Sequence, residues 1–583
     1  MGRQMRVGAS RLIMLLVLVV LSSASFLPKS LTRASHRVTR AWPQARHPPL
    51  CSTLAHLALV AADDTASLEA VAYDAGVPVV DGRVQVLVTV RADEIIEVRR
   101  AIEGLGGRVT GSVASQRWLQ AWIPATSLRA LADSPLVAHV RVPDLVRLDD
   151  ESMPAASLAL ADSPSLMGAS LWHLSGHRGH GVKIGIIDVG FGGHRALLGD
   201  ALPEQVVART FVDDENDDHL NSGSTHGTAV AEIVHRIAPQ AELYLAKIGT
   251  VPELHEAATW LVDEVGVQVI HTSPRWYALT PGDGTGAFAE LVQAAHAQGI
   301  VWVAPAGDAR ILHWSGDWID ENEEGWLDWG QGEHINLLIL DEGYTLPPDM
   351  PIDIWLRWSD WELVDQDLDL CLFHWHYSSP EIVACSSDPQ TGLSGQRPIE
   401  RLRASTADYP RFYGIGVRRV HGDRPVHLDI FVAGVTTLQH RVPGQSLAEM
   451  ADVPDVLSIS AVTAQTPHEQ AVYSSEGPTK GPGGIAANGL AKPDLSAYAG
   501  VATVSRGSFA GTAAAAAHVT GAVALVRGAH PTWGPDQVRS FLWERALDLG
   551  APGWDPVYGH GRLHLGQPPT LPPAQYWLPL ARR

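Results

Sequence analysis

Apolar runs along the chain change in length and period near residues 180, 311 and 446. From about 180, runs of four to six mostly apolar residues alternate with stretches of helical spacing. Such runs are typical of parallel strands that are covered by helices on both faces. We expect strands at 182–187, 243–248, 267–270 and 300–304, helices at about 227–237, 253–264 and 286–298, and the same pattern resuming at 456–462 and ending in an Ala-rich helix at 512–530.

A smaller unit precedes this region, within residues 76–147. Its apolar spacing predicts the order strand, helix, strand, strand, helix, strand, and Gly106 with Gly107 ends the first helix. This order is that of a small ferredoxin-like unit. The predicted elements cover 84–90, 93–105, 108–113, 118–123, 124–132 and 136–142.

Residues 311–445 interrupt the α/β pattern. Residues 353–358 and 367–373 alternate with a period close to two, which predicts an inserted β-sandwich. Tryptophans are dense here, and we expect most of them to lie in the core, although a ligand platform is an alternative. They are Trp314, Trp318, Trp326, Trp329, Trp355, Trp358, Trp361 and Trp375.

The N-terminus has the pattern of an export signal. Arginines 3, 6 and 11 precede ten apolar residues at 12–21, and small residues suit cleavage after Ala24. Ten residues are too few to span a bilayer, which takes roughly 20. We therefore expect a signal peptide at 1–24, a secreted protein, and no integral membrane segment after its removal. We expect a linker with little structure at 25–75 and an irregular Pro-rich tail at 567–583.

The excess of acidic over basic residues bears on which classes of partner the protein can bind. Lys and Arg number 43 against 64 Asp and Glu, a formal net charge of −21, which argues against nucleic acid and anionic membranes. None of the three cysteines has metal-ligand spacing. Export permits a disulfide between Cys371 and Cys385, two free thiols are the alternative, and Cys51 is expected to be unpaired.

Five motifs carry a family resemblance. Residues 181–190 (GVKIGIIDVG), 225–231 (THGTAVA) and 508–521 (SFAGTAAAAAHVTG) resemble the three active-site blocks of the subtilisin-like serine proteases, the subtilases. Residues 473–478 (YSSEGP) and 492–495 (KPDL) resemble supporting segments of that family, and all five occur in its order. The resemblance covers about 180–310 and 446–566. It implies a subtilisin-like parallel sheet with helices on both faces, and it makes the unit before it similar to a subtilase prodomain.

The resemblance also assigns catalytic roles. In the family a serine attacks the scissile carbonyl, a histidine takes its proton, and a buried aspartate orients that histidine. It implies that Asp188 is the orienting carboxylate and His226 the base. Alone, these residues would be a strand-end turn residue and a surface histidine, and only their motifs favour the catalytic roles.

This chain departs from the family pattern at the reacting atoms. Ala513 stands at the nucleophile position, and its methyl group can neither attack nor be deprotonated. Residues 301–308 resemble the strand that ends in the oxyanion-hole Asn, but Asp308 stands there. An ionised carboxylate has no donor for an oxyanion and repels it.

The segment that resembles the substrate-pairing strand differs too. It contains Ser273, Pro274 and Arg275. Pro274 has no N–H for strand pairing, and we expect the bulk of Arg275, where the family has Gly, to fill the specificity pocket.

One loop has a sequence pattern that resembles a calcium-binding site. Asp320, Asn322 and Glu324 place oxygen atoms at alternate positions before a Gly, as at the opening of a calcium loop. A solvated acidic turn is the favoured alternative, so we expect no required cofactor and keep Ca²⁺ as a prediction.

Three functions remain open from the sequence. The first is a secreted subtilase-fold protein, divided into parts at 166–310 and 446–566, that binds a peptide or protein without cutting it. The second is an active serine endopeptidase with a displaced nucleophile. The third is carbohydrate or surface binding by residues 311–445.

Overall fold

The computed structural model describes residues 49–63, 65–92, 94–146, 163–340, 343–376, 379–407 and 411–569. The predicted signal peptide and most of the Pro-rich tail lie outside these ranges. Within them, no helix is both long and apolar enough to cross a membrane.

Residues 163–310 and 446–569 form the part of the molecule that is here called the body. A seven-stranded sheet lies at its centre. All its strand pairs are parallel, as the long apolar runs predict, because both faces are covered. The two edge strands, β7 and β24, were not predicted. The strand order is β24 (Leu495–Ala499), β21 (Val456–Thr463), β10 (Val301–Pro305), β9 (Val269–Thr272), β6 (Lys183–Asp188), β8 (Glu242–Lys247) and β7 (Val207–Thr210).

Helices cover both faces of this sheet. Helices α8 (His226–Ile237) and α11 (Gly511–Ala529) share one hydrophobic cluster with the strands. On the other face lie α9 (Val251–Thr259), which continues into a π-helical turn, η6 (Trp260–Val265), and α10 (Ala287–Ala297). The mixed α/β architecture with a parallel sheet agrees with the sequence. The short helices α6 (Ser163–Leu166), α7 (Ala169–Leu174) and α12 (Pro535–Arg545) complete the body.

The N-terminal unit comprises residues 50–146. It has a five-stranded antiparallel sheet with the order β1-β2-β4-β3, and β5 pairs with β2. Two helices, α2 and α3, add to its hydrophobic core. The expectation of little structure at 25–75 is therefore wrong for 52–74, where buried leucines and alanines make helical faces. The elements are α2 (Ser52–Asp63), α3 (Thr65–Asp74), β1 (Val79–Val80), β2 (Arg83–Val90), α4 (Ile95–Gly104), β3 (Arg108–Val113), β4 (Trp118–Pro124), α5 (Leu128–Ala132) and β5 (Val137–Arg141).

Residues 311–445, here called the insertion, form two antiparallel sheets whose side chains meet in one hydrophobic cluster. One sheet has the order β11-β19-β14-β17 and the other β16-β15-β18-β12-β20, with β13 beside β18. The strands are β11 (His313–Asp317), β12 (Asn336–Ile339), β13 (Thr345–Leu346), β14 (Pro351–Trp358), β15 (Asp367–His376), β16 (Ser379–Ser386), β17 (Ile399–Ser405), β18 (Arg411–His421), β19 (His427–Ala433) and β20 (Thr437–Leu438).

Cross-strand pairing brings Cys371 of β15 opposite Cys385 of β16, and the two form a disulfide. The structure thereby decides between the two alternatives that the sequence left open. Cys51 is free and buried.

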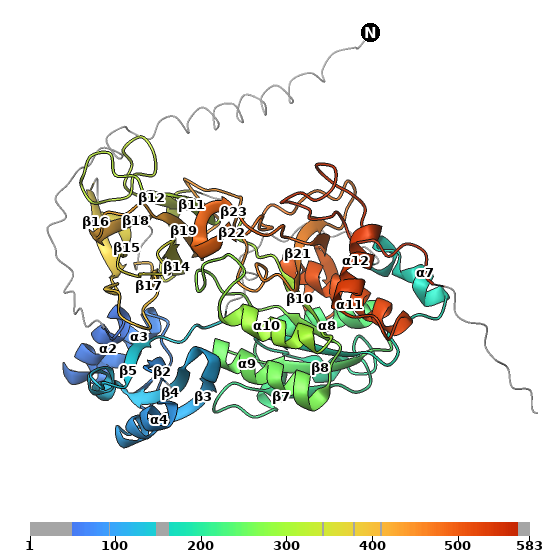
Figure 1. The fold of residues 1–583 in the computed structure, drawn as a ribbon, viewed down its shortest axis with the longest axis horizontal. Coiled ribbons are helices and arrows are strands. Elements are labelled where there is room, and N and C mark those ends of the chain that lie inside the picture. The colour runs from blue at the N-terminus through green and yellow to red at the C-terminus, as the bar shows by residue number, and fades with distance from the viewer. Residues whose placement is uncertain are drawn as a thin grey trace, which may run out of the picture.

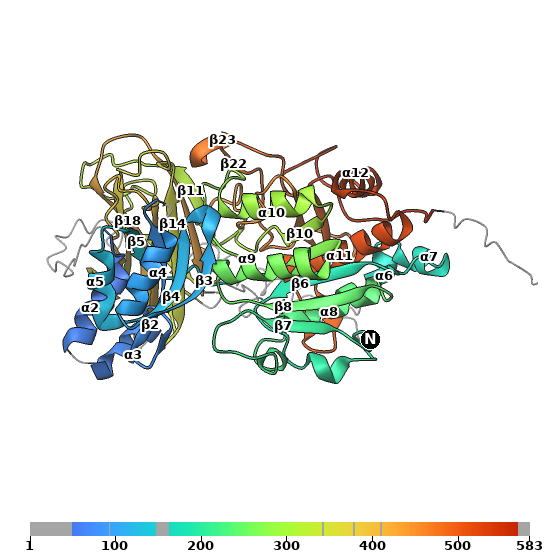
Figure 2. The same cartoon turned by 60° about the horizontal axis from the view of Figure 1, so that its bottom comes forward.

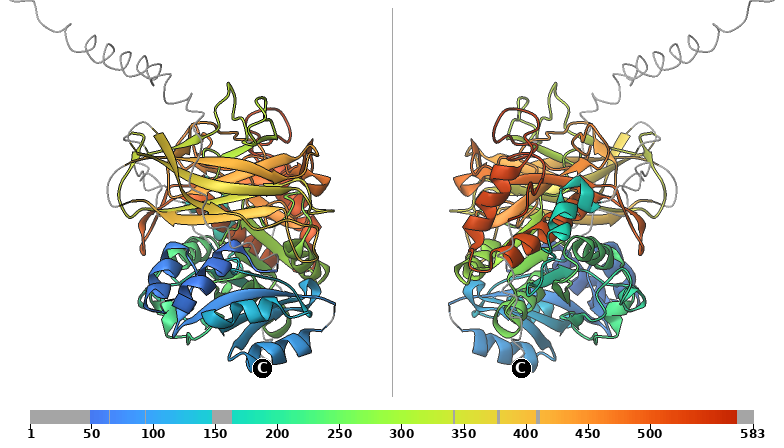
Figure 3. Two further views of the ribbon diagram at one scale, coloured as in Figure 1. Left: turned by 90° about the vertical axis from the view of Figure 1, so that its left-hand side faces the viewer. Right: turned by 90° about the vertical axis from the view of Figure 1, so that its right-hand side faces the viewer.

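The three parts pack side by side. The insertion lies over the N-terminal unit, and both flank the same side of the body (Figure 1). The views in Figures 2 and 3 agree, with the yellow and orange strands of the insertion above the blue N-terminal unit. Helix α9 of the body runs beside β3 of the N-terminal unit (Figure 2).

Candidate active site

Asp188 and His226 meet at the carboxyl end of the parallel sheet. Asp188 ends β6 and His226 begins α8, and both are fully buried. His226 Nδ1 lies 2.8 Å from Asp188 Oδ2. Because a carboxylate only accepts hydrogen bonds, Nδ1 carries the hydrogen and Nε2 is the nitrogen that remains for base chemistry. A Cβ on Gly227 would lie 2.8 Å from Cβ of Asp188, so only glycine lets the helix start approach this closely.

Ala513 lies in the first turn of α11, and the segment just before it reaches this pair. It is 1% exposed. Phe509, four residues earlier, packs its ring edge-on against His226 with centroids 5.1 Å apart. The segment that resembles the nucleophile block therefore reaches the histidine, but it brings a methyl group instead of a hydroxyl.

Asp308 follows β10 and reaches the start of the same helix. Its Oδ1 accepts a hydrogen bond of 2.9 Å from the backbone N–H of Thr512. The first N–H groups of a helix have no partner within the helix, and a negative charge there interacts favourably with the helix dipole. In this chain the carboxylate acts as a cap for α11.

Arg275 pairs with this carboxylate. Its Nη1 lies 2.5 Å from Asp308 Oδ2 and donates a second hydrogen bond of 3.1 Å to Thr512 Oγ1. Both charged side chains are almost wholly buried. A positive and a negative group therefore occupy the region beside Ala513 and neutralise each other.

Comparisons with known proteins agree with this arrangement. The family model described as the subtilase family matches residues 430–561. Subtilisin DY from Bacillus licheniformis is 30% identical over 159 residues, which cover 25% of this chain and 53% of that protein. The matches support a relationship to the subtilase family over part of this chain, residues 430–561 in the family model. It spans about half the length of the curated relative it matches.

The fold likeness extends further than the sequence match. The structure of the Clostridium perfringens CspB protease has a TM-score of 0.50 and 16% identity, and the match covers 70% of this chain and 98% of that one. At that identity the likeness concerns the fold alone.

The structure buries the predicted substrate-binding segment. Ser273, Pro274 and Arg275 directly follow β9, and all three are buried. Arg275 was expected to fill a pocket by bulk, but its guanidinium is directed at Asp308 and Thr512. The sequence analysis singled out Arg275 and Asp308 as separate departures from the family pattern, and it did not predict that they form an ion pair.

His271, which sequence reasoning did not single out, lies fully buried on β9. Thr520 Oγ1 donates to the carbonyl of Ala516, so it accepts from His271 Nδ1 at 2.8 Å. Nε2 then accepts from Ser273 Oγ, also at 2.8 Å. Burial lowers the pKa of His271 to about 3, and its ring stays neutral. This relay fixes the segment beside the Asp188–His226 pair.

The loop predicted as a calcium site has the contacts of a tight acidic turn. Asp320 accepts hydrogen bonds from the backbone N–H groups of Glu324 and Gly325, and Asn322 Oδ1 accepts from Glu324 as well. Among the described residues, no three or more His, Cys, Asp or Glu side chains gather to hold a metal ion. These contacts fit the acidic-turn alternative, and calcium binding stays a prediction.

Most of the tryptophans in the insertion belong to its core. Trp358 is 1% exposed, and Trp314 and Trp329 pack edge-on with ring centroids 4.7 Å apart. Trp355 is also buried, but it packs against Tyr277 outside the insertion. Buried indoles fill volume and offer no flat surface to a sugar ring.

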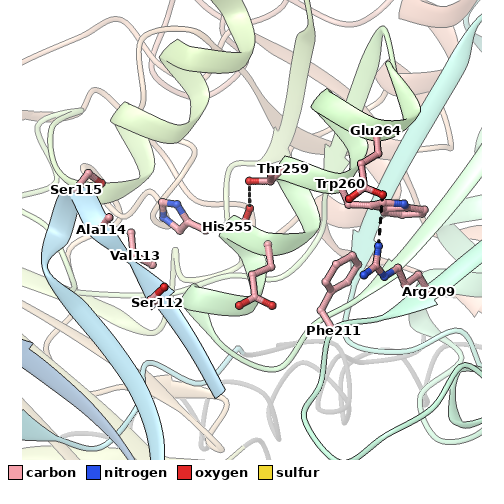
Figure 4. Close-up of a pocket in the computed structure, with 11 residues that line it drawn as sticks. Ser112, Val113, Ala114, Ser115, Arg209, Phe211, His255, Thr259, Trp260 and Glu264 are labelled. Carbon is pink, nitrogen blue, oxygen red and sulfur yellow. Dashed lines mark hydrogen bonds and ion pairs between the residues drawn. The ribbon is translucent and has the colours of Figure 1, made fainter. Parts of the chain in front are cut away.

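A cavity of about 420 Å³ lies at the seam between the N-terminal unit and the body (Figure 4). Trp260 and Arg209 lie on one side of it, and His255 points toward β3 on the other. The cavity is on the α9 face of the sheet, whereas His226 and Ala513 begin helices on the opposite face. It is lined by Ser112, Val113, Ala114, Ser115, Arg209, Phe211, His255, Glu256, Thr259, Trp260 and Glu264.

Proposed function

We propose that this protein binds a peptide or protein without cutting it by the subtilase mechanism. The observation that carries the proposal is Ala513 at the start of α11, directly after the segment whose Phe509 packs on His226 of the buried Asp188–His226 pair. The base and its orienting carboxylate are present, but no hydroxyl lies at the position from which the family attacks the carbonyl. In subtilisin, loss of this serine costs on the order of a million-fold in turnover.

The second catalytic element is replaced as well. Oxyanion stabilisation requires a donor aimed at the developing charge, and losing one such donor costs roughly 100- to 1000-fold. Asp308 Oδ1 and Oδ2 are acceptors that are already engaged by Thr512 and Arg275. A tetrahedral intermediate formed here would meet a carboxylate where the family provides an amide.

We propose that neighbouring serines do not substitute for the missing nucleophile. Ser508 and Phe509 are adjacent in the short strand β26 (Gly507–Phe509), so their side chains point to opposite faces. Since the Phe509 ring lies against His226, Ser508 points away from it. Ser505 is anchored by its backbone N–H, which donates to Glu232 Oε1. An active endopeptidase, the second candidate function, would therefore require a nucleophile other than Ser505 or Ser508.

We assign roles to the other parts within the same proposal. Residues 76–147 correspond to a prodomain and residues 311–445 to an inserted β-sandwich, and the chain is exported. Family prodomains are removed by the enzyme itself, so a chain without self-cleavage keeps this unit attached. Among the described residues of the insertion, no contact favours a carbohydrate over a protein ligand.

A paired binding and cleavage assay tests the proposal. The purified full chain is incubated with a mixed peptide library, and mass spectrometry measures both retained and shortened peptides. Retention without new termini supports the proposal. New termini that disappear in His226→Ala show an active peptidase and contradict the proposal. A result with no retained peptides and no cleaved peptides contradicts the part of the proposal that concerns peptide binding.

A further inference from the structure

A cavity of about 80 Å³ lies where the N-terminal unit, the body and the insertion meet. Arg141 and Asp144 line it from the N-terminal unit, Leu279 from the body, and Arg397 and Arg401 from the insertion. A cavity of this volume has room for roughly six water-sized groups. A tetrahedral oxyanion has five heavy atoms, so the cavity suits a small ion and not a peptide.

The insertion packs directly on the N-terminal unit beside this cavity. A Cβ on Gly395 would lie 3.0 Å from Cβ of Ala138, which places a loop of the insertion against β5. Arg401 Nη1 donates to the carbonyl of Pro143 at 3.3 Å. These contacts hold the arginines of the insertion close to those of the N-terminal unit.

One ion pair in the cavity wall is only half satisfied. Arg141 Nη1 lies 2.5 Å from Asp144 Oδ1, and Arg397 Nη2 donates to the same oxygen at 3.4 Å. Arg141 Nη2 and Asp144 Oδ2 are buried as well, but neither atom has a hydrogen-bond partner among the described residues. Because a buried donor and a buried acceptor are costly to leave unpaired, the pair matches a group that both accepts and donates.

The cavity also carries an excess of positive charge. Its lining includes four arginines and three carboxylic acids, namely Arg141, Arg397, Arg401, Arg403, Asp144, Asp388 and Glu400. Burial and the neighbouring Asp388 raise the pKa of Glu400 well above its ordinary value, so Glu400 keeps its proton. Asp353 lies 4.0 Å from Arg403 and adds one negative charge. Even with Asp388 ionised, four guanidinium groups therefore meet three carboxylates.

The pKa values of two neighbouring bases reflect this excess. Burial and the charge of Arg141 lower the pKa of Arg397 to about 10. Burial and the charges of Arg141 and Arg397 lower the pKa of His139, on β5, to about 3. Both shifts favour the loss of positive charge, and a bound anion would offset that tendency.

We propose that this cavity binds one small oxyanion that retains a proton, such as hydrogen phosphate. Its oxygen atoms accept hydrogen bonds from Arg141 Nη2 and from the guanidinium groups of the insertion, and its hydroxyl group donates to Asp144 Oδ2. The ion then joins the three parts of the molecule at their common junction. This inference goes beyond the proposed function and is independent of it, because it does not involve the position of Ala513.

Isothermal titration calorimetry on the full chain tests the site. The protein is dialysed into a phosphate-free buffer at neutral pH and titrated with sodium phosphate or sodium sulfate at constant ionic strength. We expect one phosphate per chain and at least about 100-fold weaker binding of sulfate, which has no proton to donate to Asp144 Oδ2. No binding of phosphate, or equal binding of the two anions, would overturn the proposal.

A phosphate ester separates the free ion from a phosphorylated molecule as the source of the ligand. The cavity has room for the ion but not for a phenyl group in addition. We therefore expect phenyl phosphate to bind at least about 10-fold more weakly than inorganic phosphate. Equal binding of the ester would contradict the assignment to a free ion.

Variants locate the site by the preference between the two anions. Asp144→Asn exchanges an acceptor for an amide donor, so the preference for phosphate over sulfate should fall at least about 10-fold. Arg401→Gln removes one positive charge and should weaken both anions at least about 10-fold. Arg108→Gln, which removes a pair with Asp213 outside the lining, is the control and should change neither value.

The decision does not depend on the variants alone. Near-ultraviolet circular dichroism shows whether each variant is folded, and the wild-type titration with two anions decides by itself if one is not. A folded Asp144→Asn that keeps the full preference for phosphate would overturn the role of Asp144 Oδ2. Equal affinities of wild type and folded Arg401→Gln would place the ion elsewhere and overturn the site.

Discussion

Arg275 and Asp308 are two departures from the family pattern that form one buried ion pair, with Nη1 and Oδ2 2.5 Å apart. They are 33 residues apart in the chain and come from loops after neighbouring strands, β9 and β10. Each alone would leave an uncompensated charge in the interior, which is far more costly than a pair. At the position where the resemblance implies an oxyanion hole, the pair makes a structural contact with Thr512.

Breaking this pair from one side should destabilise the fold. Arg275→Met leaves Asp308 buried without its cation, and removal of one partner of a buried pair costs about 3–5 kcal/mol. Arg275→Gly combined with Asp308→Asn removes both charges and restores the family's residue types, so we expect a smaller loss. Urea unfolding of the three proteins measures the difference. A single variant that is as stable as the double variant would show that the pair is not coupled.

The disulfide of the insertion should contribute to its stability. Cys371 and Cys385 close a loop of 14 residues, and loops of this size give about 3 kcal/mol in the chain-entropy account. We expect the non-reduced chain to be lighter than the reduced chain by two hydrogen atoms. Cys371→Ser with Cys385→Ser should lower the unfolding midpoint, while Cys51→Ala serves as a control that leaves the disulfide in place. Equal masses before and after reduction would contradict the bond.

Glu253 should make stability depend on pH. Burial raises its pKa from 4.5 to about 7, because the hydrogen bonds from Gly249 and Gln120 only partly offset the loss of water. The folded chain keeps the proton where the unfolded chain has lost it, so stability falls as the pH rises from about 4.5 to 7 and is level above that.

A neutral isostere removes this dependence. Relative to wild type, Glu253→Gln should gain stability progressively across that window, by up to about 3 kcal/mol above it, and should differ little near pH 4. Chemical unfolding at several pH values measures the gain, with Glu290→Gln as a control at another carboxylate that contacts the N-terminal unit. A gain that is the same at every pH would refute the assignment to Glu253.

Restoring the serine alone should give little activity. Ala513→Ser supplies the hydroxyl, but Asp308 still stands where an oxyanion needs a donor. We expect Ala513→Ser with Arg275→Gly and Asp308→Asn to cleave peptides at least about 100-fold faster than Ala513→Ser. A fluorogenic peptide assay compares them, and equal rates would show that the pair at Asp308 does not limit the chemistry.

Local patterns predicted five of the seven strands of the parallel sheet, because burial on both faces leaves a plain signature in sequence, but only two strands of the insertion. Strand β3 was predicted with its observed bounds, and α8 and α11 lie within one residue of prediction. The helices at 52–74 were missed because their short apolar faces lie among Arg- and Pro-containing stretches.

The features that could not be predicted from the sequence are contacts between segments that lie far apart in the chain. The Arg275–Asp308 pair has no spacing signal, since each residue was interpreted only by comparison with the residue type expected there. The meeting of Arg397 with Asp144 joins positions 253 residues apart, and only the packing of the insertion on β5 brings them together. His271 was overlooked because a lone histidine in a strand is not distinctive until its partners Thr520 and Ser273 are placed.

The most direct measurement is the intact mass of the purified protein after exposure to a fluorophosphonate, which labels activated serines. The account predicts no adduct on the wild-type chain and a mass that lacks only the signal peptide, while Ala513→Ser with Arg275→Gly and Asp308→Asn takes up one label. A labelled wild-type chain, with the adduct mapped to a serine near His226, would contradict the central claim that the nucleophile expected from the subtilase resemblance is absent.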